Sequence, residues 1–142
     1  MSTELKIKDP VEVAEGIMLK LPQVDCPLTH YFTPGVYCRE IFMPAGSMVI
    51  GHKHKTEHMN IVLSGLANVS INGIVQEIKA PFSFKSGVGD RKVLMILEDM
   101  RWMTVHPTDE TDLDKLMDLL IEKSETFVLH AEQLKQLKGG SS

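Results

Sequence analysis

The stretch Gly46–Gly65, GSMVIGHKHKTEHMNIVLSG, places His52, His54 and His58 close together. Side chains alternate between the two faces of a strand, so His52 and His54 share one face. His58 follows the polar turn at residues 55–57 and returns to the same point if the strand bends there. Neutral imidazole is the commonest protein ligand for transition metals. The stretch therefore predicts a site for one divalent metal, which we expect to be zinc, iron, manganese or nickel.

A solvated turn is the alternative interpretation, because HKHKTEH is hydrophilic enough for a loop that binds nothing. Two flanking features favour the metal site. Gly46 precedes the first histidine by six residues, and the apolar segment MNIVLSG follows the third histidine and ends at Gly65. A strand on each side of the cluster would hold the imidazoles in place.

Short apolar segments separated by turn residues continue through residues 36–107, the predicted β core. VYCREIFM and HMNIVLSG read as strands because they are rich in β-branched and aromatic residues. LANVSI and IVQEIK flank Asn72-Gly73, which predicts a two-residue type I′ hairpin, since both turn positions need φ > 0. FSFK, RKVLMIL and RWMTVH complete the set, with a turn expected at residues 98–100. The pattern predicts an all-β fold, an antiparallel barrel or sandwich.

Segments of different character flank this core. Residues 1–35 form a predicted N-terminal arm. Its residues 11–21 make a short helix or cover a sheet edge, and three prolines oppose long regular structure over residues 21–35. Residues 108–138 form a predicted C-terminal helical extension. Its amphipathic helix covers about residues 111–123, and a strand, FVL, and a second short helix follow. Residues 139–142, GGSS, look like a linker or tag remnant.

The composition narrows the function classes. The chain has 142 residues, a formal net charge of -4 and no cluster of lysines and arginines, which argues against a nucleic-acid surface. No apolar run reaches the length of a membrane span and no secretory signal is evident, so we expect a cytoplasmic protein without membrane contact. Cys26 and Cys38 are expected to be reduced thiols.

The spacing of Gly46, the three histidines and Gly65 resembles the first sequence signature of the cupin superfamily. His58 stands where that signature has Glu, which leaves an all-imidazole set similar to the three-His iron sites of some cupin dioxygenases. The resemblance implies a single small antiparallel β-barrel of the jelly-roll type with a C-terminal amphipathic helix. It also implies a metal held by His52, His54 and His58.

The second cupin signature matches poorly. When this part of the chain is aligned on Gly87, Asp90 falls on the position of the ligand histidine. The fourth metal ligand therefore stays open between Asp90, His106 on the last strand, and water.

Longer stretches, among them HYFTPGVYCRE, HKTEHMNIVLSG and APFSFKSGVGDRKV, resemble small cupin-like proteins of tailed bacteriophages, whose function is unknown. In that pattern the position of His52 is Lys in relatives, whereas His54, His58 and His106 match. This favours a site formed by His54, His58 and another histidine. The resemblance implies a location in the host cytoplasm or in the virion.

Further polar residues are candidates for substrate chemistry. We expect Glu57 or His106 to act as acid or base. His30, Arg39 and Arg91 are candidate substrate-binding residues. Each has a plainer alternative: a hydrogen bond to a neighbouring loop for His30, and a solvent-facing side chain or salt bridge for the arginines. An arginine inside the barrel would bind a carboxylate or phosphate bidentately.

The leading prediction is a metal-binding cupin, an enzyme of dioxygenase, isomerase or lyase type that acts on a small oxygen-bearing substrate. One alternative is a non-enzymatic phage accessory protein that binds a small ligand or a host protein. Another is a structural homo-oligomer in which the metal is a brace. Leu113, Leu116, Leu120 and Ile121 share a helix face that is suited to core packing or to a homodimer contact.

Overall fold

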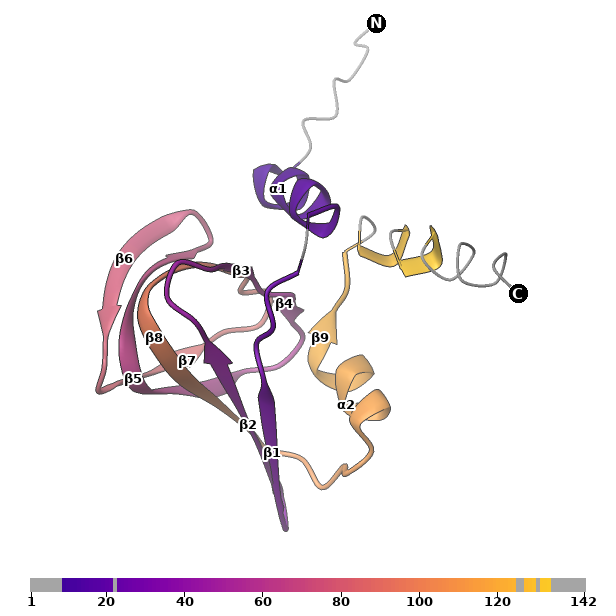
Figure 1. Cartoon of the computed structure of the whole chain (residues 1–142). Coiled ribbons are helices and arrows are strands. Elements are labelled where there is room, and N and C mark those ends of the chain that lie inside the picture. Colours follow the sequence, from indigo (N-terminus) through magenta and orange to yellow (C-terminus); the bar gives the residue numbers. More distant parts are fainter. Residues whose placement is uncertain (1–8, 22, 125–126, 130, 134–142) are drawn as a thin grey trace, which may run out of the picture. The chain divides into compact units, whose positions relative to one another are not determined.

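The computed structural model describes residues 9–21, 23–124, 127–129 and 131–133, which divide into two compact units (Figure 1). The barrel unit is Val24–Glu122, and the helical unit comprises the described residues before and after it. The helices and strands are α1 (Pro10–Leu19), β1 (Leu28–Thr33), β2 (Val36–Met43), β3 (Met48–Ile50), β4 (Lys53–His54), β5 (His58–Ile71), β6 (Ile74–Lys79), β7 (Phe82–Ser86), β8 (Lys92–His106), α2 (Leu113–Leu120) and β9 (Ile121–Glu122).

The helical unit contains α1 and a second helical segment near the C-terminus. Asp9 caps α1 by accepting a hydrogen bond from the Val11 amide, and a proline occupies the first turn, where its missing N–H is not needed. Residues 127–129 are helical, so the predicted FVL strand is wrong. Ser124 explains the difference, because its hydroxyl accepts the Phe127 N–H and caps this segment. The residues predicted as a linker remnant lie outside the described residues.

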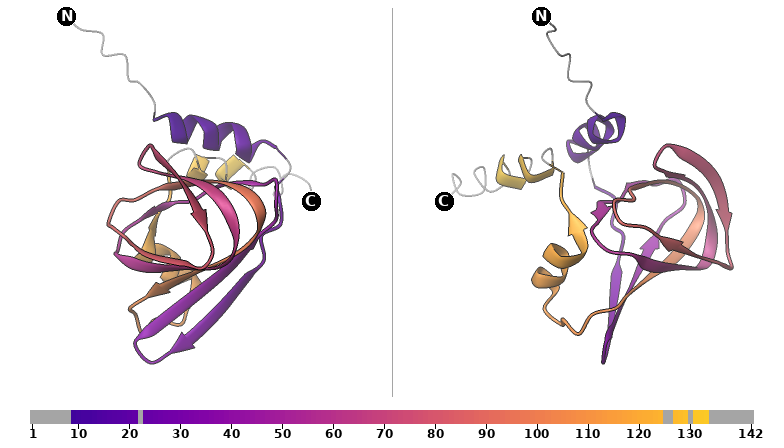
Figure 2. Two further views of the ribbon diagram at one scale, coloured as in Figure 1. Left: turned by 90° about the vertical axis from the view of Figure 1, so that its left-hand side faces the viewer. Right: turned by 180° about the vertical axis from the view of Figure 1, so that it is seen from behind.

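The barrel unit is built on one antiparallel sheet in the order β1-β2-β8-β5-β6, with β3 paired to β8 and β7 paired to β5. In the left view of Figure 2 the strands of this unit curve around a common interior. A second, two-stranded sheet joins β4 to β9. The predicted antiparallel all-β core is confirmed. None of the described helices is long and apolar enough to cross a membrane.

Two predicted turns are absent, because the segments around them form single long strands, β5 and β8. Residues 98–100 lie within β8. Gly65 lies within β5 at φ +100°, where the β5–β8 register shifts. A Cβ on Gly65 would lie 2.7 Å from the Met100 Cα, so only glycine lets the two backbones approach this closely. The glycine therefore bends a strand rather than ending it.

The predicted Asn72-Gly73 hairpin is confirmed. Both residues have positive φ, 52° and 85°, and the flanking Ile71 and Ile74 are paired in register. A strand was not expected at residues 28–33, where prolines lie nearby. β1 nevertheless pairs with β2 along its whole length, because Pro27 and Pro34 fall just outside the paired residues.

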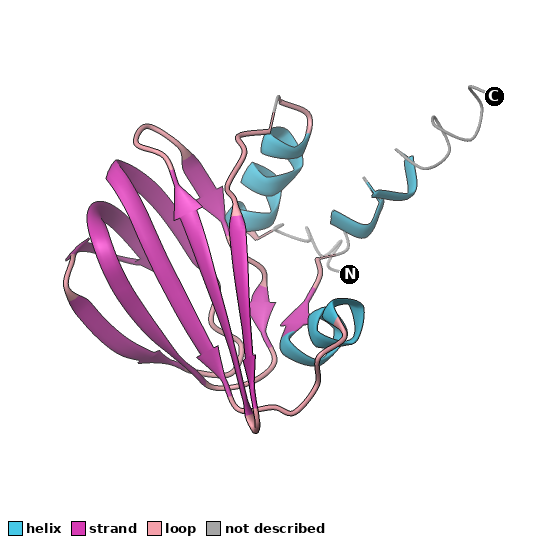
Figure 3. Ribbon diagram, turned by 60° about the horizontal axis from the view of Figure 1, so that its bottom comes forward, coloured by secondary structure: helices cyan, strands magenta, loops and turns pink. Residues whose placement is uncertain are grey.

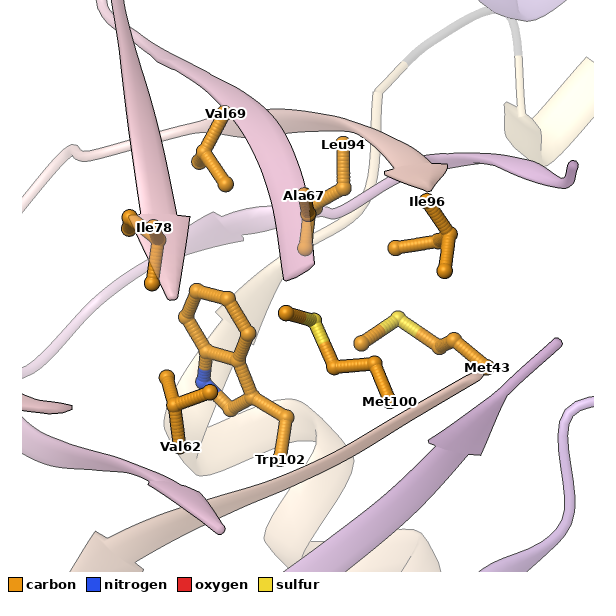
Figure 4. Close-up of a cluster of buried hydrophobic side chains, with 9 residues drawn as sticks. All are labelled: Met43, Val62, Ala67, Val69, Ile78, Leu94, Ile96, Met100 and Trp102. Atoms are coloured by element: carbon orange, nitrogen blue, oxygen red, sulfur yellow. The ribbon is translucent and has the colours of Figure 1, made fainter. Parts of the chain in front are cut away.

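The apolar core lies inside the barrel (Figure 4). The core side chains come mainly from inward-facing positions of β2, β5 and β8, with one from β6. They are Met43, Val62, Ala67, Val69, Ile78, Leu94, Ile96, Met100 and Trp102. This packing fixes the faces of β2, β5 and β8, and several of the remaining inward positions of those strands carry polar residues.

Helix α2 and strand β9 form the last part of the barrel unit, and Figure 3 shows them beside β4. Asp112 caps α2 by accepting hydrogen bonds from the amides of residues 114 and 115. Leu116, Leu120 and Ile121 are buried against Tyr37 of β2. Most of the predicted apolar face therefore packs within the same unit. The predicted homodimer stays a prediction.

Candidate functional site

A cavity of about 400 Å³ lies inside the barrel unit, between the strands and the α2–β9 segment. Inward-facing positions of β2 and β8 form much of its wall, and apolar side chains predominate. The lining residues are Leu28, His30, Tyr37, Arg39, Ile41, Met43, Val49, Gly51, His52, His54, Asn60, Lys92, Leu94, Trp102, Thr104, His106, Leu113, Leu116, Met117, Leu120 and Ile121. A largely apolar cavity with a few convergent polar groups is typical of a small-molecule site.

Three histidine rings gather at this cavity, from three different strands. The ring centroid of His58 lies 4.1 Å from that of His54 and 4.9 Å from that of His106, and those of His54 and His106 are 6.3 Å apart. β4 supplies His54, the start of β5 supplies His58, and the end of β8 supplies His106. β5 and β8 are neighbours in the sheet, which brings their ends together.

Each of the three rings has a buried nitrogen that makes no hydrogen bond within the described part of the chain. These atoms are Nδ1 of His54, Nε2 of His58 and Nδ1 of His106. The opposite nitrogens of two rings are engaged: His58 Nδ1 lies 3.4 Å from the Thr56 carbonyl oxygen, and His106 Nε2 lies 2.9 Å from the Thr104 hydroxyl. Since a carbonyl only accepts, His58 carries its proton on Nδ1 in that contact, which leaves the Nε2 lone pair available.

The three imidazoles are held neutral. Burial, followed by the charges of neighbouring groups, lowers the pKa of His54 to about 2. The same causes lower the pKa of His106 to about 3, and burial also lowers the pKa of His58. Neutral imidazole is the form that binds a metal. Among the described residues, however, no group of three or more His, Cys, Asp or Glu side chains is arranged as a bound metal ion requires.

A row of polar side chains crosses the cavity wall next to these histidines. His30 of β1 is paired in register with Arg39 of β2, Arg39 with Thr104 of β8, and Thr104 with Asn60 of β5. All four residues line the cavity. His30 Nδ1 also lies 2.6 Å from the Tyr37 hydroxyl. The row joins four adjacent strands at one level of the barrel.

Asn60 anchors this row to the core. Its side chain is fully buried, accepts a hydrogen bond from Trp102 Nε1 at 3.0 Å and donates to the Ser86 hydroxyl at 2.7 Å. It also lies 3.3 Å from the Phe84 carbonyl. Because its polar atoms are already bonded, Asn60 positions neighbouring side chains and keeps little capacity for a ligand.

Two cationic side chains, Arg39 and Lys92, also line the cavity. Lys92 is only 6% exposed, and burial lowers its pKa to about 8. Burial lowers the pKa of Arg39 as well. Neither side chain makes an ion pair or hydrogen bond to another described residue. Among the described residues that line the cavity there is no aspartate or glutamate.

The structure brings together only part of the predicted site. His52 lines the same cavity as His54 and His106, and so do the predicted substrate-binding residues His30 and Arg39. His58 joins the cluster through its ring contacts with His54 and His106.

The other predicted residues lie outside the cavity lining that the described chain forms. The Glu57 carboxylate is exposed and lies 3.6 Å from Lys85 Nζ. Asp90 accepts hydrogen bonds from the Gly87 amide and from Asn72 Nδ2, so its oxygens close a loop. Arg91 Nε donates to the Gly51 carbonyl at 2.9 Å.

Sequence reasoning missed Lys92, Asn60 and Tyr37 as cavity residues. A charged residue at the end of a strand, such as Lys92, is typical of a solvated sheet edge. The alternation of side chains along the strand could have indicated the position of Lys92, because Lys92 is on the same face of β8 as Leu94 and Ile96, which are buried in the core. Tyr37 similarly alternates with Arg39 on β2.

No family model matches this sequence, and no curated protein matches it. Solved structures do match its fold. Salicylate 1,2-dioxygenase from Pseudoaminobacter salicylatoxidans has a TM-score of 0.58 at 13% identity over 80% of this chain, which spans 34% of that enzyme. KdgF from a Halomonas species has a TM-score of 0.53 at 13% identity, covering 67% of this chain and 90% of its own.

A third structure is described as an RmlC-like cupin with a double-stranded β-helix fold, from Methanocaldococcus jannaschii. Its TM-score is 0.51 at 12% identity, covering 63% of this chain and 86% of its own. At such low identity the likeness concerns the fold, and it agrees with the antiparallel barrel described above. The chain therefore has the cupin jelly-roll fold.

Proposed function

We propose that this protein is a metal-binding cupin that acts on a small molecule in the barrel cavity, with His54, His58 and His106 as the metal ligands. The observation that carries the proposal is the set of three touching imidazole rings, each with a buried nitrogen lacking a hydrogen bond among the described residues. Leaving a buried polar group unsatisfied costs about 1–3 kcal/mol. A shared cation would satisfy all three nitrogens once the rings turn toward one point, an arrangement that the described side chains do not have in this structure.

The surroundings of the rings support this assignment. The depressed pKa values keep the nitrogens deprotonated at neutral pH, so a metal would not have to displace protons. Contacts with Thr56 and Thr104 orient two of the rings from the side opposite the free nitrogens, as outer-shell partners do in metal sites. His52, from the same sequence motif, lines the cavity and is the alternative to His106 as third ligand.

A metal with an open coordination position would polarise an oxygen atom of a bound molecule. The protein's own part is to enclose that molecule. α2 and β9 cover the cavity with Leu116, Leu120 and Ile121, which excludes water from the apolar side. Thr104 and the Tyr37 hydroxyl lie on the polar side and are able to orient a ligand by hydrogen bonds.

A second function, non-catalytic ligand binding in the same cavity, is favoured by the position of Glu57. That residue is the predicted acid or base, yet its carboxylate is exposed beside Lys85. No carboxylate lines the cavity of the described chain. If His106 is engaged as a metal ligand, neither of the two predicted acid or base residues is free to act in the cavity, and binding without turnover is the expected behaviour.

The metal assignment is tested by elemental analysis of purified protein after equilibration with Zn²⁺ and removal of free metal. We expect about one equivalent in the wild type, in line with one structural or catalytic site. His58→Ala and His106→Ala should each lose most of it, and Glu57→Gln, which alters an exposed carboxylate nearby, should not. Less than about a tenth of an equivalent in correctly folded wild type would refute the proposal.

A further inference from the structure

Arg39 and Lys92 place two positive charges inside the barrel. Arg39 faces inward from β2 between Tyr37 and Ile41, and Lys92 faces inward at the start of β8 together with Leu94; all five line the cavity. The alternation of both strands fixes this direction, because their other inward residues form the apolar core. Neither cation can turn outward without reversing the register of its strand.

No acidic group of the described chain compensates these charges within the cavity. The lining contains neither aspartate nor glutamate, and no ion pair joins either cation to another described residue. Asp90 favours the charged form of Lys92, but its two oxygens are bonded to the Gly87 amide and the Asn72 amide group. Glu40, the neighbour of Arg39 in sequence, faces the opposite side and pairs with Arg101 at 2.9 Å.

An uncompensated charge is costly when it is buried, as at Lys92, or half-buried, as at Arg39, and arginine cannot relieve the cost by losing its proton. Such a pair of cations is expected where a bound anion completes the site. The guanidinium has five donors in a planar fork, which suits the two oxygens of a carboxylate or phosphate. The proposed metal would add positive charge to the same cavity and increase the demand for an anion.

Much of the remaining cavity wall is apolar. Ile41, Val49 and Leu94 line it from the strands, and Leu116 and Met117 line it from α2. An inorganic ion alone would leave this surface uncovered. A ligand with both a charged group and an apolar body matches the whole lining, since apolar contact contributes affinity and polar groups fix orientation.

We infer that the cavity binds a small organic anion, a carboxylate or phosphate ester on an apolar body, whose charged group lies between Arg39 and Lys92. The inference rests on the proposed function only in placing the ligand in the same cavity. Thr104 and His30, in register with Arg39, provide further hydrogen-bonding groups beside the anion.

Binding of benzoate, phenyl phosphate and the uncharged benzamide tests this inference. Trp102, the only tryptophan of the chain, lines the cavity, so its fluorescence reports on binding directly. We expect at least one anion to bind saturably, and at least about tenfold more tightly than benzamide, since hydrogen bonds to charged groups are worth that much. The anion that binds more tightly shows whether the site prefers a carboxylate or a phosphate. Equal binding of all three, or of none, would overturn the inference.

Two substitutions locate the anion. Arg39→Gln and Lys92→Met should each weaken binding of the preferred anion about tenfold or more and leave benzamide unchanged. Arg101→Gln and Lys79→Met, exposed positions on β8 and β6, are the matched controls. If Arg39→Gln does not fold, Arg39→Lys retains the charge and should retain part of the affinity. Folded Arg39 and Lys92 variants with wild-type anion binding would overturn the inference.

Each titration is run with chelator and again after metal loading, with metal content measured in parallel. If only the histidine proposal fails, the protein stays metal-free and still prefers the anion through Arg39 and Lys92. If only the anion inference fails, the protein binds metal and does not distinguish benzoate from benzamide. The two failures therefore give different results.

Discussion

Replacing Gly65 with alanine tests the close approach of β5 and β8, the two long paired strands at whose ends His58 and His106 lie. The backbone at this residue has φ +100°, so a side chain costs about 1–2 kcal/mol in conformational strain. The new Cβ would also lie 2.5 Å from the Asp99 carbonyl oxygen and 2.7 Å from the Met100 Cα. Overpacking of this kind typically costs about 1–3 kcal/mol more.

Together these effects should lower the free energy of unfolding by about 2–5 kcal/mol, a large part of the total of about 5–15 kcal/mol for a typical domain. Urea unfolding followed by Trp102 fluorescence and circular dichroism measures the loss. Gly73→Ala is the matched control, because Gly73 also has positive φ, 85°, but a Cβ there meets nothing within 4 Å. It should cost only the strain, about 1–2 kcal/mol.

The difference between the two variants isolates the contact between the strands. If Gly65→Ala and Gly73→Ala destabilise the protein equally, the β5 and β8 backbones are not in contact at Gly65. The bend of β5 at this residue would then not depend on how closely β8 passes.

Three further predictions concern the interior of the barrel. Asn60→Leu should lower the free energy of unfolding, measured in urea, by about 2–5 kcal/mol, because it leaves the Trp102 N–H and the Ser86 hydroxyl without partners. The control Asn68→Leu, at an exposed position, should cost less than about 0.5 kcal/mol. Similar losses of stability in Asn60→Leu and Asn68→Leu would contradict the buried hydrogen-bond network around Asn60. Burial lowers the Lys92 pKa from 10.5 in the unfolded chain to about 8 in the folded protein. Between pH 8 and pH 10.5 the unfolded chain therefore binds more protons than the folded protein, and the free energy of unfolding should rise with pH, by at most about 1.4 kcal/mol per pH unit. Plots of the free energy of unfolding against pH should therefore diverge between wild type and Lys92→Met over that pH range. Parallel plots would refute the burial of a charged Lys92. Zn²⁺ at a hundredfold excess over its dissociation constant should raise the free energy of unfolding of the wild type by about 2.7 kcal/mol, and a chelator should reverse the effect. His58→Ala should not be stabilised. Equal stabilisation of the two proteins would contradict ligation of the metal by His58.

The fold was largely predictable from sequence where one local interaction decides the structure. Asn72-Gly73 specifies its hairpin because few residues accept two successive positive φ angles. The helix predicted over about residues 111–123 follows from its apolar repeat, but it is shorter, Leu113–Leu120. Asp112 caps it, and Ile121 and Glu122 pair with β4 as strand β9 instead of continuing the helix. By contrast, Gly65 looks like a turn in sequence. Its actual role depends on how closely β8 passes, which is a long-range contact that no local pattern reveals.

The candidate site was predictable to a smaller extent. His54 and His58 share one motif, and their proximity follows from its spacing. His106 lies far along the chain and reaches the cluster only because β5 and β8 pair in a particular register. Glu57 has the right chemistry for catalysis, but the turn before β5 directs its side chain outward, toward Lys85. Side-chain direction in a turn has no periodicity to read.

The presence of Lys92 in the cavity shows why charge alone misleads. Lysines on strands usually face solvent and protect exposed edges. Here the strand is central, paired on both sides, and its first residue continues an inward-facing row. Only the pairing of β8 with β3 and β5 decides that this position is interior.

X-ray absorption spectroscopy of the zinc-loaded protein is the most direct test of the central claim, that His54, His58 and His106 bind one metal ion. Scattering from imidazole rings gives the number of histidine ligands, and we predict three, at about 2.0–2.1 Å from zinc. The number should stay at three in His52→Ala, whereas the zinc that His106→Ala still binds should have two imidazole ligands. Absence of bound zinc, or a loss of one imidazole in His52→Ala but not in His106→Ala, would contradict the claim.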